Sequence, residues 1–153
     1  MFKKYAICLI MVCVLVMGLT GCAKKQAPQP APVSVAPKGD VGGIHYSVTE
    51  NASYFRKSKT AGYYIDTLDE PNAPYFVFIT SGEKKTSGYN VVVTGIDVDA
   101  NSDVKITVQF TEPESKANVT KGKTYPVTQV TLDQMPGDVT VELTDGSTLI
   151  WLE

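Results

Sequence analysis

The sequence predicts an all-β fold: an antiparallel sandwich or partly open barrel of about eight strands, preceded by a signal peptide and a disordered linker. Two observations support this fold class. Residues 44–153 contain 34 Val, Ile and Thr but only five Leu and five Ala, a composition that favours strands over helices. The same residues alternate between apolar and polar in short runs that end at Gly, Pro, Asn or Asp.

The clearest strand is 104–110, because Val104, Ile106 and Val108 fall on one face and the residues between them on the other. The run 75–80 is apolar almost throughout, as is typical of a strand buried on both faces. Asp145-Gly146 lies between two apolar runs and predicts a hairpin. The predicted strands are 44–49, 62–66, 75–80, 89–98, 104–110, 125–132, 139–143 and 148–152.

Aromatic residues are frequent in this domain, and most are expected in its core. Tyr63 and Tyr64 are neighbours on a predicted strand, so their side chains point to opposite faces of the sheet. We therefore expect one of the two to face outward. Such a residue either marks a contact surface or lies under a covered second face of the sheet.

The N-terminus has the features of an export signal. Lys3 and Lys4 precede an apolar run that is short for a bilayer span, and the run ends in Leu19-Thr20-Gly21-Cys22. These four residues resemble a bacterial lipobox. The resemblance implies a lipoprotein signal peptide over 1–21, a diacylglycerol thioether on the Cys22 thiol, cleavage before Cys22, and acylation of the new N-terminal amine with a fatty acid such as palmitate. Membrane lipid would thus be one partner, and the protein would sit on the outer face of the cell membrane or on an outer membrane.

Residues 22–43 are predicted to be a linker. After Cys22 this segment contains Pro28, Pro30, Pro32 and Pro37 and has no aromatic residue, so it is a poor candidate for a packed core. The folded domain is predicted over 44–153. Cys8 and Cys13 lie in the leader, so Cys22 would be the single cysteine of the mature chain, which excludes an internal disulfide and cysteine catalysis there.

Composition and charge exclude several functions. Residues 44–153 hold nine Lys and Arg against 15 Asp and Glu, a net charge of −6, which argues against nucleic-acid binding. The one histidine, His45, lies at the start of the domain and is more typical of a frayed strand than of a catalytic group. The sequence offers no acid–base set, so we predict no enzyme activity and no cofactor.

Residues 97–103 place side chains with oxygen ligands at alternating positions (Asp97, Asp99, Asn101 and Asp103), like the start of a calcium loop. Ser102 stands where such a loop requires Gly, and Val108 stands where it requires a bidentate Glu. A polar hairpin turn is the favoured interpretation, and weak calcium binding is the alternative.

The stretch Thr80–Val91 (TSGEKKTSGYNV) joins the most apolar strand to the next through a loop longer than a tight hairpin. Together with the preceding PYFVFIT and the later TYPV, it resembles the PrcB C-terminal family, over about 75–132. The family pattern falls on Gly82, Glu83, Lys84, Thr86, Gly88 and Tyr89, while Lys85 stands where proline is common. The resemblance implies an exported lipoprotein that associates with, or stabilises, a secreted protease.

The Lys-Lys-Thr-Ser-Gly-Tyr segment is also similar to a loop of the chagasin-like cysteine-protease inhibitors, whose fuller signature begins Asn-Pro-Thr-Thr-Gly-Tyr. Their second inhibitory loop has no counterpart here. A third interpretation makes Gly88-Tyr89 a structural corner only, in a structural envelope lipoprotein.

The sequence therefore predicts a membrane-anchored interaction module with a protein partner, for which the family resemblance suggests a secreted protease. The predicted contact loop is Gly82, Glu83, Lys84, Lys85, Thr86, Gly88 and Tyr89, in which the two lysines would engage acidic groups.

Overall fold

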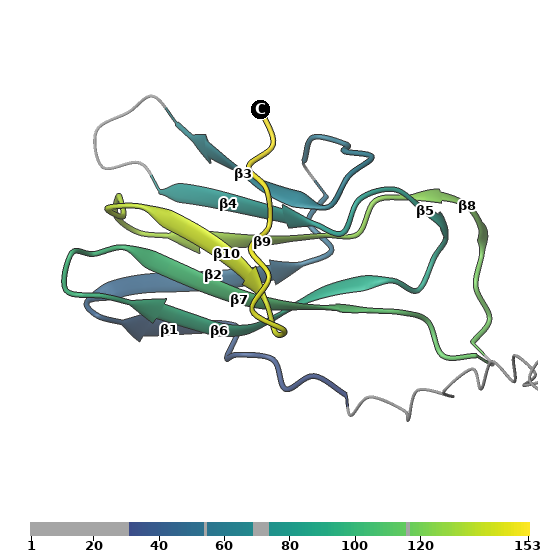
Figure 1. Ribbon diagram of the computed structural model, residues 1–153, viewed down its shortest axis with the longest axis horizontal. Helices are drawn as coiled ribbons and strands as arrows, with labels where there is room; N and C mark the ends of the chain where they lie inside the picture. The colour runs from purple at the N-terminus through teal and green to yellow at the C-terminus, as the bar shows by residue number, and fades with distance from the viewer. Residues whose placement is uncertain (1–30, 54, 69–73, 116) are drawn as a thin grey trace, which may run out of the picture. The chain divides into compact units, whose positions relative to one another are not determined.

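The computed structural model describes residues 31–53, 55–68, 74–115 and 117–153. The described chain is all-β, confirming the predicted class, and contains ten strands and no helix (Figure 1). The strands are β1 (Lys38–Val41), β2 (Ile44–Glu50), β3 (Gly62–Thr67), β4 (Tyr75–Thr80), β5 (Lys84–Thr86), β6 (Asn90–Val98), β7 (Val104–Thr111), β8 (Lys121–Thr124), β9 (Val127–Leu132) and β10 (Val139–Leu143). Among the described residues, none forms a helix suited to crossing a bilayer.

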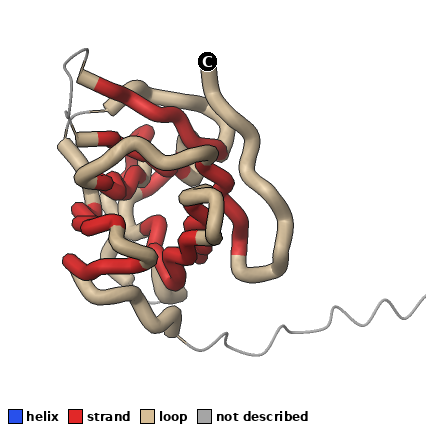
Figure 2. Tube along the Cα trace, turned by 90° about the vertical axis from the view of Figure 1, so that its left-hand side faces the viewer, coloured by secondary structure: helices blue, strands red, loops and turns tan. Residues whose placement is uncertain are grey.

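The strands form a sandwich of two main sheets with a small third sheet. The first sheet has the order β1-β2-β9-β4-β3 and is antiparallel throughout. The second has the order β10-β7-β6, and the third pairs β5 with β8. The strands surround a shared interior when viewed from the side (Figure 2). None of the sheets closes into a barrel.

One pairing departs from the antiparallel prediction. β10 runs parallel to β7, with Val139 opposite Val104 and Leu143 opposite Val108. A parallel neighbour requires a long crossover, and here the chain passes through β8 and β9 before it returns. Alternation of residue types predicts a strand but carries no information on its direction, so this feature was not predictable.

The core lies between the two main sheets. The alternation predicted for β7 is observed, since Val104, Ile106 and Val108 are buried and the intervening residues are more exposed. Across the interior they face the buried side chains of β4 and β9. The remaining fully buried aliphatic residues of this cluster are Val77, Ile79, Val93, Val130, Leu132 and Val141.

Neither Tyr63 nor Tyr64 marks an exposed contact surface, because their exposed fractions are only 7% and 3%; the alternative of a covered second face is confirmed. Tyr63 lies in the main core and donates a 2.9 Å hydrogen bond to the carbonyl of Val139 in the other sheet. Tyr64 lies on the opposite face, stacked on Phe78, where Ala52 covers it. The segment between β2 and β3 thus closes the outer face of the first sheet.

The described chain begins before the predicted domain boundary. β1 pairs with β2 across the turn 42–43, so a boundary at Ile44 falls between two paired strands. The amide of Val35 donates to the carbonyl of Val93 (2.9 Å), and the amide of Val48 donates to the carbonyl of Pro37 (2.8 Å). Residues 35–37 therefore bridge β6 and β2, one strand from each main sheet. The predicted signal peptide, Cys22 and residues 23–30 lie outside the described residues.

The predicted C-terminal hairpin forms its turn but not its second strand. The carboxylate of Asp145 accepts hydrogen bonds from the amide and hydroxyl of Ser147, and the amide of Leu149 still donates to Val141. The chain then leaves β10, and the amide of Leu152 donates to the carbonyl of Tyr63 in β3. Gly62 makes this crossing possible, because a Cβ there would lie 2.6 Å from the carbonyl oxygen of Ile150.

Candidate partner-binding site

The predicted contact loop is more ordered than expected. Residues 84–86 form β5, which pairs with β8 at Lys84–Thr124 and at Thr86–Lys121, with a shift of register between the two. β8 lies between the predicted strands 104–110 and 125–132, where the sequence predicts no strand. The two strands form an arm at one end of the molecule (Figure 1).

The base of the arm is fixed by Gly82. Its φ of +78° lies in the left-handed region, and a Cβ there would be 2.8 Å from the carbonyl oxygen of Lys59. The next amide, that of Glu83, donates to the same oxygen at 3.2 Å. Gly82 therefore allows the segment between β2 and β3 to lie directly against the start of the arm.

Glu83 ties the arm together. Its carboxylate accepts a 2.7 Å hydrogen bond from the hydroxyl of Tyr125 and a 3.1 Å bond from the ammonium of Lys123. These two bonds hold the pKa of Glu83 below its usual value, with a smaller contribution from the charge of Lys59. Bonding to the Glu83 carboxylate raises the pKa of both Tyr125 and Lys123. The Glu83 side chain is 25% exposed and already has partners, so its observed role is structural.

The lysines of the predicted loop differ in their surroundings. Lys84 is half-buried and its ammonium lies 5.3 Å from the centre of the Tyr89 ring, a cation–π distance. Lys85 is exposed. Lys57, from the segment between β2 and β3, lies in the same way over Tyr125, at 5.6 Å.

The rest of the loop forms a corner. The hydroxyl of Thr124 donates to the carbonyl of Thr86 at 2.6 Å, and Ser87 exchanges two bonds with Thr120. Gly88 has a φ of +93°, and a Cβ there would lie 2.8 Å from the Pro113 side chain. The bonds of Ser87 and the positive φ of Gly88 thus explain why the chain turns a corner at Gly88-Tyr89.

Sequence reasoning missed the basic residues that other segments bring to the arm. Arg56, Lys57 and Lys59 precede β3, while Lys121 and Lys123 belong to β8. The sequence signal that could have found them is that they are grouped in two short basic runs, 56–59 and 121–123, in an otherwise acidic domain. Their convergence depends on the pairing of β5 with β8, which the sequence does not predict.

The other candidate sites have local structural explanations. The carboxylate of Asp99 accepts hydrogen bonds from the amides of Asn101 and Asp103, which makes 97–103 a self-bonded hairpin turn. His45 pairs with Asp40 on β1 at 2.8 Å, with both side chains exposed. In the part of the chain that the structure describes, no group of three or more His, Cys, Asp or Glu is arranged to hold a metal ion.

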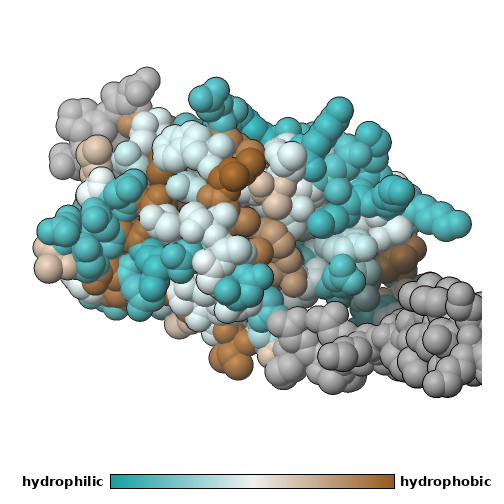
Figure 3. All heavy atoms as spheres, in the orientation of Figure 1, coloured by the Kyte–Doolittle hydropathy of each residue, from teal (hydrophilic) through white to brown (hydrophobic). Residues whose placement is uncertain are grey.

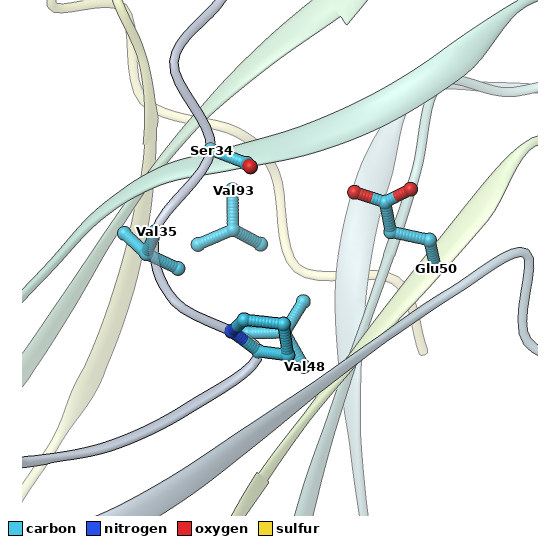
Figure 4. Close-up of a pocket in the computed structure, with 6 residues that line it drawn as sticks. Ser34, Val35, Val48, Glu50 and Val93 are labelled. Atoms are coloured by element: carbon cyan, nitrogen blue, oxygen red, sulfur yellow. The ribbon is translucent and has the colours of Figure 1, made fainter.

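A small recess lies where the N-terminal segment crosses the sandwich (Figure 4). Val35, Pro37, Val48 and Val93 give it apolar walls, and Ser34 and Glu50 complete its lining. No acid–base pair is present in this lining. The recess is the packing seam between the segment 34–37 and the two sheets.

Residues 75–133 match the family model described as PrcB C-terminal. The matched segment runs from the start of β4 to the residue after β9, so it includes the whole arm. The match confirms the resemblance inferred from the Gly-Glu-Lys and Gly-Tyr motifs, and it indicates a protease-complex-associated module. No curated protein and no solved structure matches the chain.

Proposed function

We propose that this protein is a lipid-anchored interaction module that binds or stabilises a secreted or envelope protease, and that the β5–β8 arm makes the contact. The observation that carries the proposal is the position of the arm. It lies within the matched segment 75–133, and backbone and side-chain hydrogen bonds hold it in place. A fixed projection loses little conformational entropy on binding, which favours recognition.

The proposed mechanism is tethering. Acylated Cys22 holds the chain on a membrane, and the following residues let the domain reach its partner. Confinement to one surface raises the effective concentration of the partner without any new contact. The protein acts here as a subunit and not as a catalyst, in line with its lack of an acid–base set in sequence.

Crosslinking in the native envelope tests the partner. A photoreactive residue at Lys85, which is exposed on the arm, should crosslink to a protease or its precursor. The control places the photoreactive amino acid at Lys105 instead, at the opposite end of the domain. If no protease is crosslinked from position 85 or from position 105, the proposed function is wrong.

The anchor is tested separately through Cys22→Ser. This variant should accumulate as an unprocessed chain that takes up no labelled palmitate. Normal processing and labelling would contradict the anchor but not the contact. An assay against papain-type proteases addresses the chagasin-like alternative, which predicts inhibition by the purified domain.

A further inference from the structure

The charges of this domain are separated between its two ends. Gly62, Thr80 and Val127 are aligned in the first sheet and mark the end that carries the arm. Beyond this end lie seven of the eight Lys and Arg that the structure describes from residue 44 onward. They are Arg56, Lys57, Lys59, Lys84, Lys85, Lys121 and Lys123, and we call them the basic surface.

The opposite end is acidic. Thr67, Tyr75 and Leu132 mark it in the first sheet, and Val98 and Val104 mark it in the second. Lys105 lies near this end and pairs weakly with Asp97, at 3.9 Å, and Lys38 lies on β1 opposite Ser47. The described acidic residues there are Asp40, Asp66, Asp97, Asp99, Asp103, Asp133 and Asp138. The net charge of −6 for residues 44–153 thus conceals a basic end.

Three separate segments build the basic surface, and direct contacts join them. The Lys59 carbonyl accepts a bond from the Glu83 amide, and the Lys123 ammonium bonds the Glu83 carboxylate. Lys57 lies over the ring of Tyr125, whose hydroxyl bonds the same carboxylate. The members are exposed except for half-buried Lys84, and hydrophilic residues project from the upper part of this end in the view of Figure 3.

Few acidic groups interrupt this surface. Glu83 is the acidic residue inside it, and Tyr125 and Lys123 already occupy its carboxylate. Glu112 and Glu114 flank Pro113, which lies against Gly88 at the far side of the corner, and exposed Glu50 lies opposite Thr128 at the edge of the same end. Six cations therefore remain for an external anionic partner once Lys123 is assigned to Glu83.

We propose that the basic surface recognises an acidic segment of a protein partner, so that carboxylates of the partner bind between the arm and the segment 56–59. This inference rests on the proposed function and specifies the chemistry of its contact. A protein is favoured over a lipid surface because the cations are held at set positions. Tyr89 lies under Lys84 and Tyr125 under Lys57, while the pairing of β8 with β5 sets the backbone position of Lys121 opposite Thr86. Attraction to a lipid surface depends on the number of cations and requires no such arrangement.

An oligoglutamate peptide is the probe for this surface. In a nuclear magnetic resonance titration of residues 23–153, it should shift amides in 56–59, 83–86 and 121–125. Binding should weaken about tenfold between low and physiological salt, because exposed charges are screened. Absence of these shifts, or shifts confined to the acidic end, would overturn the inference.

Two charge-reversal variants make the test specific. Lys85→Glu/Lys121→Glu removes two exposed members of the basic surface, whereas Lys38→Glu/Lys105→Glu makes the same change in net charge elsewhere. We expect the first to weaken oligoglutamate binding about tenfold and the second to change it by less than about twofold. Equal effects would mean that only net charge matters and would refute the inference.

Two further measurements separate the alternatives. Binding to phosphatidylserine vesicles without binding to oligoglutamate would assign the surface to membranes. Self-association abolished by Lys85→Glu/Lys121→Glu would assign it to the acidic end of a second copy. Each outcome replaces the proposed partner with another.

Crosslinking separates this inference from the proposed function. For this comparison the photoreactive residue is placed at exposed Asn90, beside the arm, in both chains. If Lys85→Glu/Lys121→Glu still crosslinks to the envelope protease as the chain without these two changes does, the protease role stands and the charge inference fails. If the unchanged chain binds oligoglutamate but crosslinks to no protease, the protease role fails and charge recognition stands.

Discussion

The phenolic hydroxyl of Tyr125 donates a 2.7 Å hydrogen bond to the carboxylate of Glu83, which lies 42 residues earlier in the chain. Tyr125 follows β8 and Glu83 precedes β5, so the bond closes the base of the arm from both sides. The ammonium of Lys123 forms an ion pair with the same carboxylate. The arm thus has a side-chain lock in addition to its backbone pairing.

Tyr125→Phe removes this hydroxyl and keeps the ring under Lys57. Glu83 loses the largest cause of its lowered pKa, so the pKa of Glu83 should rise toward its ordinary value. Carbon-detected titration of the Glu83 carboxylate measures this change. An unchanged Glu83 pKa in the variant would show that the hydroxyl does not hold the carboxylate in solution.

The pH dependence of stability follows from the same group. The Glu83 pKa is lowered from 4.5 in the folded chain, so its stabilising contribution is present above that value and is lost as pH falls through the folded pKa. The stability difference between the unchanged chain and Glu83→Gln should therefore shrink on acidification. Urea unfolding between neutral and acidic pH checks this, with Glu114→Gln as the control for loss of one exposed carboxylate. A difference independent of pH would contradict the linkage.

Gly82→Ala should destabilise the domain more than Gly146→Ala. Both glycines have positive φ, which costs a residue with a Cβ about 1–2 kcal/mol. At Gly82 the Cβ also meets the Lys59 carbonyl, whereas nothing lies within 4 Å at Gly146. We expect a loss of about 3 kcal/mol at Gly82 and about 1 kcal/mol at Gly146. Equal losses in thermal unfolding would mean that the Lys59 segment moves freely away from the arm.

A chain that starts at Ile44 should be less stable than one that starts at Ala31. The shorter chain lacks β1, and it also loses the bonds that Val35 and Pro37 make to the two sheets. We expect a loss of about 2–4 kcal/mol from these bonds and the apolar contacts of Val35. Denaturant unfolding of both chains measures it, and equal midpoints would place the boundary at Ile44 after all.

The main strands could be predicted because each spans a full alternation of residue types. β7 and β4 are examples, since burial on one face or on both leaves a clear pattern. β1, β5 and β8 have three or four residues each, too few for a pattern to emerge from a polar background. The burial of Tyr64 was unpredictable for another reason, because it depends on the non-strand segment around Ala52.

The site was predicted in part. Gly82, Glu83 and Gly88 were identified from their motif, and the structure explains the two glycines through positive φ and close contacts. Lys57 and Lys123 were not identified, because they reach Glu83 and Tyr125 from separate parts of the chain. Motifs report residues that are close in sequence, whereas a surface of this kind depends on tertiary pairing.

The crossing of residues 35–37 between the sheets has a mechanical consequence. A pull on the chain from its N-terminal side reaches the domain first at the bond from Val35 to Val93, and then at the bond from Val48 to Pro37. These bonds join the pulled segment to both sheets, so force enters the two halves of the sandwich together and does not peel one away. The C-terminal crossing through Leu149 and Leu152 lies outside that path. Single-molecule extension should therefore show one cooperative rupture of the sandwich, with no earlier release of β1 and β2 alone.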